Sequence, residues 1–135
     1  YVNLTGRVLP ELKSRGLDLG PDDFIIVCDD IALPLGSVRI RRKGSSGGHN
    51  GLKSIQAELG GDEYGRMRLG VGGPGAAANP DYVLGRFRKD EQKRVKETVT
   101  YAVEAIEYWA ANGIDKAMTK YNRVIEAPGG SIANV

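Results

Sequence analysis

Hydrophobic and polar residues follow two different periods along this chain. Residues 24–28 are continuously apolar and are followed by Asp29 and Asp30, which predicts a strand buried on both faces. Residues 38–43 alternate between apolar and basic side chains, which predicts a half-buried strand with a basic outer face. Residues 66–71 alternate in the same way, so we expect about three strands in this sequence.

Helical spacing occupies the segments between these strands. The pattern predicts helices over residues 4–15 and 49–59, and a short one over residues 115–123. The clearest helix spans residues 91–111, with an apolar stripe predicted to face the core at Val95, Val99, Val103, Ile106 and Ala110. Strands that alternate with helices indicate an α/β fold.

The chain length and the net charge are typical of a single globular domain. The length of 135 residues suits a single domain with its own core. We expect this domain to cover residues 1–126, followed by a flexible tail over residues 127–135. The 19 basic and 17 acidic residues give a net charge of only +2, so only local clusters of charge can indicate a nucleic-acid partner.

The cysteine and histidine content narrows the class of protein. The single cysteine, Cys28, excludes an internal disulfide and indicates a reducing compartment, so we expect a cytoplasmic protein. One cysteine and one histidine argue against a structural zinc site. No apolar run reaches the roughly 18 residues that a membrane span needs. We therefore expect neither a metal nor a membrane partner.

Asp29 stands where the apolar run of residues 24–28 ends. Sites in open α/β sheets form outside the carboxyl ends of strands. A carboxylate there can accept a hydrogen bond from a histidine, fix its tautomer and stabilise its cation. A turn or helix-capping aspartate would give the same pattern, so the residues alone leave both interpretations open.

Residues 44–52, with the sequence GSSGGHNGL, form a glycine-rich loop that leads into a predicted helix. Glycines let the backbone approach a ligand, and a helix N-terminus offers free N–H groups, so the segment suits a phosphate, a carboxylate or a developing oxyanion. No Gly-Lys-Ser/Thr follows, which excludes a P-loop. A flexible turn with Asn50 or Ser46 as helix cap fits equally well. His49, the only histidine, fits a general base or an orienting or capping residue.

Basic residues cluster beside this loop, at Arg39, Arg41, Arg42 and Lys43, with Arg66 and Arg68 on the next predicted strand. Such clusters bind phosphates in a salt-dependent way, and a solvated face is the alternative interpretation. The segment GVGGPG at residues 70–75 fits the dinucleotide-binding pattern G-x-G-x-x-G. However, Pro74 and Pro80 argue for a loop where that site requires a helix.

Five motifs taken in order resemble bacterial-type peptidyl-tRNA hydrolase. They are YVNLTG at residues 1–6, VCDDIALPLG at 27–36, GSSGGHNGLKSI at 44–55, RMRLGVG at 66–72 and YVLG at 82–85. The resemblance extends to about Arg123, and the block of glycine, His49, Asn50 and Gly51 is its most specific part.

The resemblance implies an α/β fold with a mixed, twisted sheet flanked by helices, like that of phosphorylases and hydrolases. It also implies a monomeric esterase that needs no cofactor and acts in translation. Its substrate would be peptidyl-tRNA, and the reaction would cleave the ester between the peptide and the 3′-terminal ribose, which recycles the tRNA.

The same resemblance implies roles for individual residues. Asp29 would orient and charge-stabilise a catalytic histidine, while Asn3 and Asn50 would hold the substrate and the attacking water. The remaining candidates would line the site or bind tRNA: Tyr1 near the tRNA end, Gly47, Gly48 and His49 as a wall, and Arg41, Lys43 and Arg68 at phosphates.

Two departures from the family pattern stand out. The family's catalytic base is a histidine in an N-terminal segment, and no residue here matches it, so we expect an N-terminally incomplete domain that is inactive as 135 residues alone. Ala32 replaces an acidic residue of the family. A non-catalytic RNA-binding relative, such as a splicing cofactor, is therefore an alternative, and a generic anion-binding domain with a small phosphorylated ligand is a third.

Overall fold

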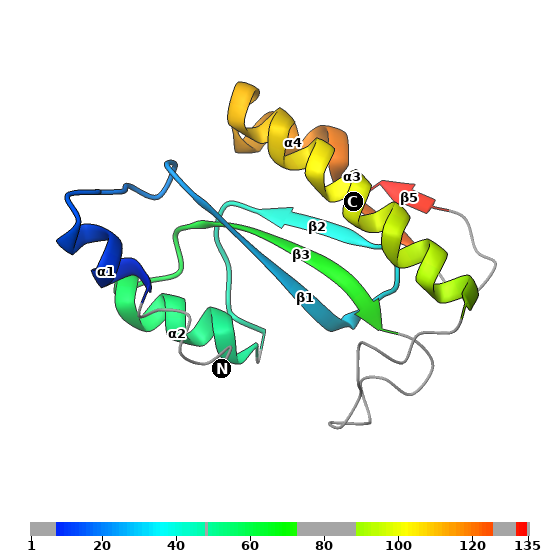
Figure 1. Cartoon of the computed structure of the whole chain (residues 1–135), viewed down its shortest axis with the longest axis horizontal. Helices are drawn as coiled ribbons and strands as arrows, with labels where there is room; N and C mark the ends of the chain where they lie inside the picture. Colours follow the sequence, from blue (N-terminus) through cyan, green and yellow to red (C-terminus); the bar gives the residue numbers. More distant parts are fainter. Residues whose placement is uncertain (1–7, 48, 73–88, 126–131, 135) are drawn as a thin grey trace. The chain divides into compact units, whose positions relative to one another are not determined.

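The computed structural model describes residues 8–47, 49–72, 89–125 and 132–134, which form four helices and five strands in these ranges (Figure 1). In chain order they are α1 (Val8–Ser14), β1 (Ile25–Pro34), β2 (Val38–Arg41), α2 (Asn50–Leu59), β3 (Gly65–Gly72), α3 (Lys89–Asn112), α4 (Ile114–Tyr121), β4 (Arg123–Ile125) and β5 (Ile132–Asn134). This mixture of helices and strands confirms the α/β class.

The strands form one sheet in the order β1-β3-β2-β4-β5. The arrows of β1 and β3 run in one direction and that of β2 in the other, so the sheet is mixed as predicted (Figure 1). β4 pairs antiparallel with β2 through Val38 and Arg123, and antiparallel with β5 through Val124 and Ala133. β4 and β5 are not in the sequence prediction, and β5 lies within residues 127–135, where we expected a flexible tail.

The chain divides into two compact units, and each is described by itself. The first contains Tyr1–Ile26 and Arg41–Arg66, and the second contains Val27–Ile40 and Met67–Val135. In the first, the described core comprises Leu52 and Ile55 of α2 with Tyr64 and Arg66. In the second, it comprises strand residues such as Val38, Ile40 and Met67, together with small residues of α3 and α4.

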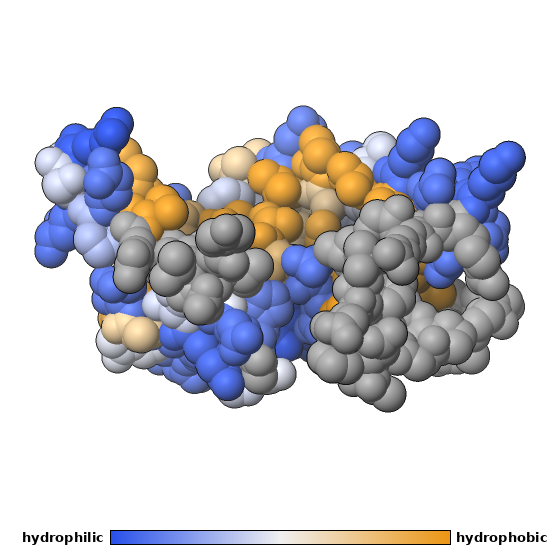
Figure 2. Space-filling model, turned by 60° about the horizontal axis from the view of Figure 1, so that its bottom comes forward, coloured by the Kyte–Doolittle hydropathy of each residue, from blue (hydrophilic) through white to orange (hydrophobic). Residues whose placement is uncertain are grey.

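Helix α3 buries a different face from the one predicted. Its buried residues are Thr98, Ala102 and Ala105, whereas Val99 and Val103 of the predicted stripe are 51% and 49% exposed. Small side chains allow a helix to pack closely against its neighbours, which favours the Thr-Ala face. Figure 2 shows hydrophobic residues, in orange, reaching the surface among hydrophilic ones, in blue.

Strand β1 is longer and more exposed than the sequence predicts. It continues through the acidic residues to Pro34, so Asp29 lies within the strand and not at its end. Val27 is 42% exposed and Ile31 is 36% exposed, so this strand is not buried on both faces among the described residues. The mistaken prediction took the first charged residues as a strand boundary, although a strand with one accessible face tolerates polar residues there.

Candidate functional site

The structure describes seven of the predicted site residues: Arg41, Lys43, Gly47, His49 and Asn50 in the first unit, and Asp29 and Arg68 in the second. Tyr1, Asn3 and Gly48 lie outside the described residues.

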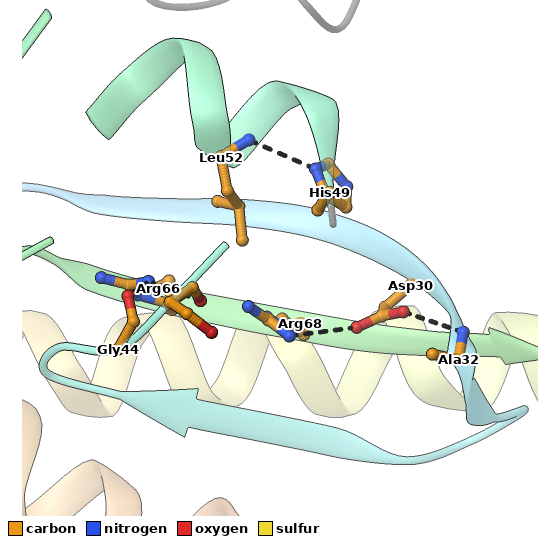
Figure 3. Close-up of polar contacts among 8 residues, drawn as sticks. Asp30, Ala32, Gly44, His49, Leu52, Arg66 and Arg68 are labelled. Carbon is orange, nitrogen blue, oxygen red and sulfur yellow. Dashed lines mark hydrogen bonds and ion pairs between the residues drawn. The ribbon is translucent and has the colours of Figure 1, made fainter. Parts of the chain in front are cut away.

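His49 is the N-cap of α2. Its backbone is extended, with φ −73° and ψ 116°, and its Nδ1 accepts a hydrogen bond from the Leu52 N–H at 3.3 Å (Figure 3). An N-cap acceptor satisfies one of the free N–H groups of the first helical turn. Of the alternatives that the sequence left open, capping is the one observed, and the cap is His49 and neither Asn50 nor Ser46.

Asn50 follows directly as the first residue of α2, and it is exposed. The first turn of a helix presents backbone N–H groups and the positive end of the helix dipole. A side-chain amide placed there can donate to a carbonyl oxygen or to a developing oxyanion, and can accept from a water molecule. The structure thus places Asn50 as an exposed residue at the N-terminal end of α2.

The start of the loop before α2 is contacted by a buried arginine of β3. Arg66 is 1% exposed, so it does not belong to a basic surface as the strand pattern predicted. Its guanidinium donates to the Gly44 carbonyl at 2.6 Å and lies 3.9 Å from the centre of the Tyr64 ring. Figure 3 shows Gly44 and Arg66 side by side. The alternating pattern of residues 66–71 does not predict that Arg66 is fully buried while the Arg68 side chain stays 17% exposed.

The basic residues just before the loop are half-buried or exposed, and Arg42 is among the exposed ones. Arg41 ends β2, where Val38 and Ile40 are buried and the arginines between and after them are half-buried. Lys43 is exposed. The predicted alternation of this strand is confirmed over Val38–Arg41.

In the second unit, Arg68 is held by Asp30. Arg68 Nη1 lies 3.5 Å from Asp30 Oδ2, and the two side chains are 17% and 12% exposed. Asp30 Oδ1 also accepts from the Ala32 N–H at 2.8 Å, so the carboxylate is fixed on two sides (Figure 3). Sequence reasoning missed Asp30 because it chose only the first of two adjacent aspartates. Successive strand residues face opposite ways, and Asp29 is exposed whereas Asp30 is half-buried.

A second cluster in this unit joins α3 to β4. The Tyr101 hydroxyl donates to the Tyr121 carbonyl at 2.8 Å, and the Arg123 guanidinium lies 3.7 Å from the centre of the Tyr101 ring. Burial raises the pKa of Tyr101, partly opposed by the positive charge of Arg123. Burial also lowers the pKa of Arg123. The aromatic rings and the cation stabilise this end of the sheet.

The described ranges contain no group of three or more His, Cys, Asp or Glu side chains that could hold a metal ion. Across the same ranges, no helix is both long enough and apolar enough to span a membrane.

A family model and the curated relatives of this chain all indicate the same protein family. The family model for peptidyl-tRNA hydrolase matches residues 1–128. The peptidyl-tRNA hydrolase of Desulfitobacterium hafniense (strain Y51) is 42% identical over 124 residues, 91% of this chain and 66% of the relative. That of Fervidobacterium nodosum is 46% identical over 125 residues, 92% of this chain and 65% of the relative. The chain thus spans slightly less than two thirds of these curated relatives.

Solved structures agree with the sequence matches. A crystal structure of a peptidyl-tRNA hydrolase in complex with N-propanol has a TM-score of 0.75 at 26% identity, over 94% of this chain and 64% of that one. The peptidyl-tRNA hydrolase of Acinetobacter baumannii has a TM-score of 0.76 at 28% identity, over 90% of this chain and 62% of that one. The chain therefore belongs to the peptidyl-tRNA hydrolase family.

Proposed function

We propose that the protein hydrolyses the ester between a peptide and the 3′-terminal ribose of tRNA, which releases and recycles the tRNA. The observation that carries the proposal is the family match over residues 1–128, which includes Asp29, Asn50 and Arg68. The local geometry of these residues supports it, because an amide at a helix start and an oriented arginine suit an ester and a phosphate.

Asn50 is proposed to act on the reacting ester. Ester hydrolysis needs an activated water and a stabilised tetrahedral intermediate, and one oxyanion donor is worth about 10²–10³-fold in rate. The exposed position of Asn50 in the first turn of α2, behind the His49 cap, supports a role in holding substrate or water. Asn3 is proposed to share this role and Tyr1 to line the site, and both lie outside the described residues.

Asp29 is proposed to orient the catalytic histidine of the family. A carboxylate that accepts from a histidine Nδ1–H fixes the tautomer and stabilises the imidazolium. The exposure of Asp29 on β1 supports access to such a partner. His49 is a poor candidate for the base, because its Nδ1 already accepts from the Leu52 N–H.

Three cations are proposed to bind tRNA phosphates: Arg41, Lys43 and Arg68. Phosphate contacts position a nucleic acid and make its affinity depend on salt. Gly47, Gly48 and His49 are proposed to form the wall of the site. We propose further that the protein works as a cytoplasmic monomer without a cofactor, and sedimentation at increasing concentration tests the monomer.

Hydrolysis of an N-blocked aminoacyl-tRNA tests the main proposal. In the active protein, Asp29→Asn is expected to lower kcat by about 10²–10⁴-fold, the usual contribution of general-base assistance. Asp22→Asn is the matched control, because Asp22 is also exposed but lies in a turn, and it should keep the wild-type rate. Full turnover by Asp29→Asn would remove Asp29 from the mechanism.

The same assay on the 135-residue chain tests the expectation that these residues alone are inactive. No cleavage is expected, because no residue of the sequence matches the family's catalytic histidine. If a form that carries the family's catalytic histidine also bound tRNA without cleaving the ester, an RNA-binding function would replace the proposed one. Displacement of tRNA by free nucleotides would instead favour a small phosphorylated ligand.

A further inference from the structure

Arg66 is the largest fully buried side chain in the described part of the protein, with 1% of its surface exposed. Arginine is rarely buried, because its charge loses hydration that only well-placed partners replace. A neutral residue of similar volume would fill the same space without this penalty. The hydrogen-bond partners of Arg66 therefore indicate why a charged, planar guanidinium occupies this buried position.

Those partners include main-chain carbonyls from two separate segments. Nη1 donates to Gly44 O at 2.6 Å and to Ser45 O at 3.4 Å, where the glycine-rich loop begins. Nη2 donates to Asp62 O and to Tyr64 O, and Nε also donates to Tyr64 O at 3.3 Å. The five N–H groups of a guanidinium lie in one plane and point in fixed directions, so one side chain can hold several carbonyls at once.

Helix α2 is tied to the same two segments. Gln56 Nε2 donates to Gly44 O at 3.2 Å, so this carbonyl receives hydrogen bonds from both Arg66 and the helix. The Tyr64 hydroxyl donates to Leu52 O at 3.4 Å, within the first turns of α2. At the other end of the loop, His49 caps the helix. Thus Arg66 fixes where the loop starts relative to the helix that carries Asn50.

We infer that Arg66 is a positioning residue, which holds Gly44 and Ser45 so that Asn50 at the start of α2 keeps its productive place. The inference rests on the proposed function, because it assigns to Asn50 a part in ester hydrolysis. Lysine cannot replace arginine here, since an ammonium is a compact charge without the planar fork that reaches carbonyls on both sides.

Amide hydrogen exchange tests the structural half of the inference without any need for activity. In Arg66→Met and Arg66→Lys, the amides of residues 45–47 and 49–52 are expected to exchange at least about tenfold faster than in the wild type. Met67→Ala is the matched control, because Met67 is the next residue of β3 and is 0% exposed. It removes buried packing but none of the carbonyl partners, so its exchange in this segment should stay near the wild-type rate.

Kinetics of a form that carries the family's catalytic histidine test the functional half, at a temperature at which circular dichroism shows every variant to be folded. Displacement of a reacting group by about 1 Å can cost up to 10²-fold, so Arg66→Lys and Arg66→Met are expected to lower kcat by about ten- to a hundred-fold, with KM changed less than about threefold. Met67→Ala should keep the wild-type kcat although it lowers the unfolding temperature.

Each outcome has one meaning. Unchanged exchange in both Arg66 variants overturns the inference, and so does faster exchange with an unchanged kcat. A kcat loss equal in Arg66→Met and Met67→Ala also overturns it, because general destabilisation would then explain both. If a form of the protein that carries the family's catalytic histidine cleaves no ester, the proposed function fails, and the exchange experiment alone decides whether Arg66 holds the loop.

Discussion

Arg68 and Asp30 form a half-buried ion pair, with Nη1 and Oδ2 3.5 Å apart. The carboxylate is held in place by the Ala32 N–H, so it presents a fixed acceptor to the guanidinium. Asp30 therefore holds the Arg68 guanidinium in a defined direction, and the proposed role of Arg68 is to bind a tRNA phosphate.

The salt dependence of tRNA binding tests this arrangement. Arg68→Ala is expected to weaken binding and to reduce the slope of log Kd against log salt by about 1, as the loss of one phosphate contact does. Asp30→Asn should weaken binding with the slope retained, because the arginine keeps its charge but loses its orienting partner. Lys116→Ala on the exposed side of α4 is the control and should change neither quantity. An unchanged slope in Arg68→Ala would exclude Arg68 as a phosphate ligand.

The helix cap at His49 predicts a selective effect on stability. His49→Ala removes the acceptor for the Leu52 N–H and is expected to lower the free energy of unfolding by about 1 kcal/mol. His49→Asn keeps a capping oxygen and should retain most of that stability. Urea denaturation of both variants measures the difference, and equal midpoints for His49→Ala and the wild type would show that the cap contributes nothing.

Two glycines outside helices should respond in opposite ways to alanine. A Cβ at Gly72 would overlap the Ile31 carbonyl and lie 2.7 Å from the Leu33 carbonyl oxygen, and these main-chain atoms cannot move away cheaply. Gly72→Ala is therefore expected to destabilise the protein by about 1–3 kcal/mol. At Gly61 an added Cβ meets nothing within 4 Å, so Gly61→Ala should be neutral or slightly stabilising. Thermal unfolding of the pair checks the contrast, which a stable Gly72→Ala would contradict.

The raised pKa of Tyr101 predicts that the folded protein becomes slightly less stable at alkaline pH. Its pKa is raised by burial from an ordinary value of 10.0, so the folded state keeps the phenol proton longer than the unfolded state does. The stabilising contribution is fully present below pH 10.0 and is lost as the pH rises through the folded pKa. Because Tyr101 is only partly buried, the effect should be small.

Tyr101→Phe isolates this contribution. The variant loses the hydrogen bond to the Tyr121 carbonyl, which should cost about 1 kcal/mol near neutral pH. The difference between variant and wild type should then shrink between pH 9.5 and 11, roughly the range over which an exposed tyrosine titrates. A difference that stays constant over this range would mean that the phenol of Tyr101 titrates alike in both states.

The elements with strong local periodicity were predictable. The helix expected over residues 49–59 appears as Asn50–Leu59, and the strand expected over residues 66–71 appears as Gly65–Gly72. By contrast β4 and β5 have three residues each, too few for a period, and they exist because they pair across the sheet. In α3 the existence of the helix was predictable, but its buried face depends on what packs against it.

For the candidate site, too, local sequence patterns explain only part of what the structure shows. The candidate residues were named from the family resemblance and stay a prediction, whereas the contacts of Arg66 and Asp30 could not be predicted from the sequence. Arg66 and Arg68 occupy equivalent places in the alternating pattern, but one contacts main-chain carbonyls and the other a carboxylate. Those partners are separated from them by up to 38 residues, so no local pattern encodes the difference.

The contacts of Asn122 affect when the main chain of β2 can complete its hydrogen bonds during translation. Its side-chain amide accepts from the Ile40 N–H and donates to the Ile40 carbonyl at 3.1 Å, across 82 residues of sequence. In this way Asn122, which directly precedes β4, adds side-chain hydrogen bonds at Ile40 to the pairing of β2 with β4. Since synthesis proceeds from the N-terminus, β2 emerges long before this partner has been translated. A nascent chain that pauses before position 122 would therefore carry β2 without the two Asn122 hydrogen bonds at Ile40, and these would form only after translation through Asn122.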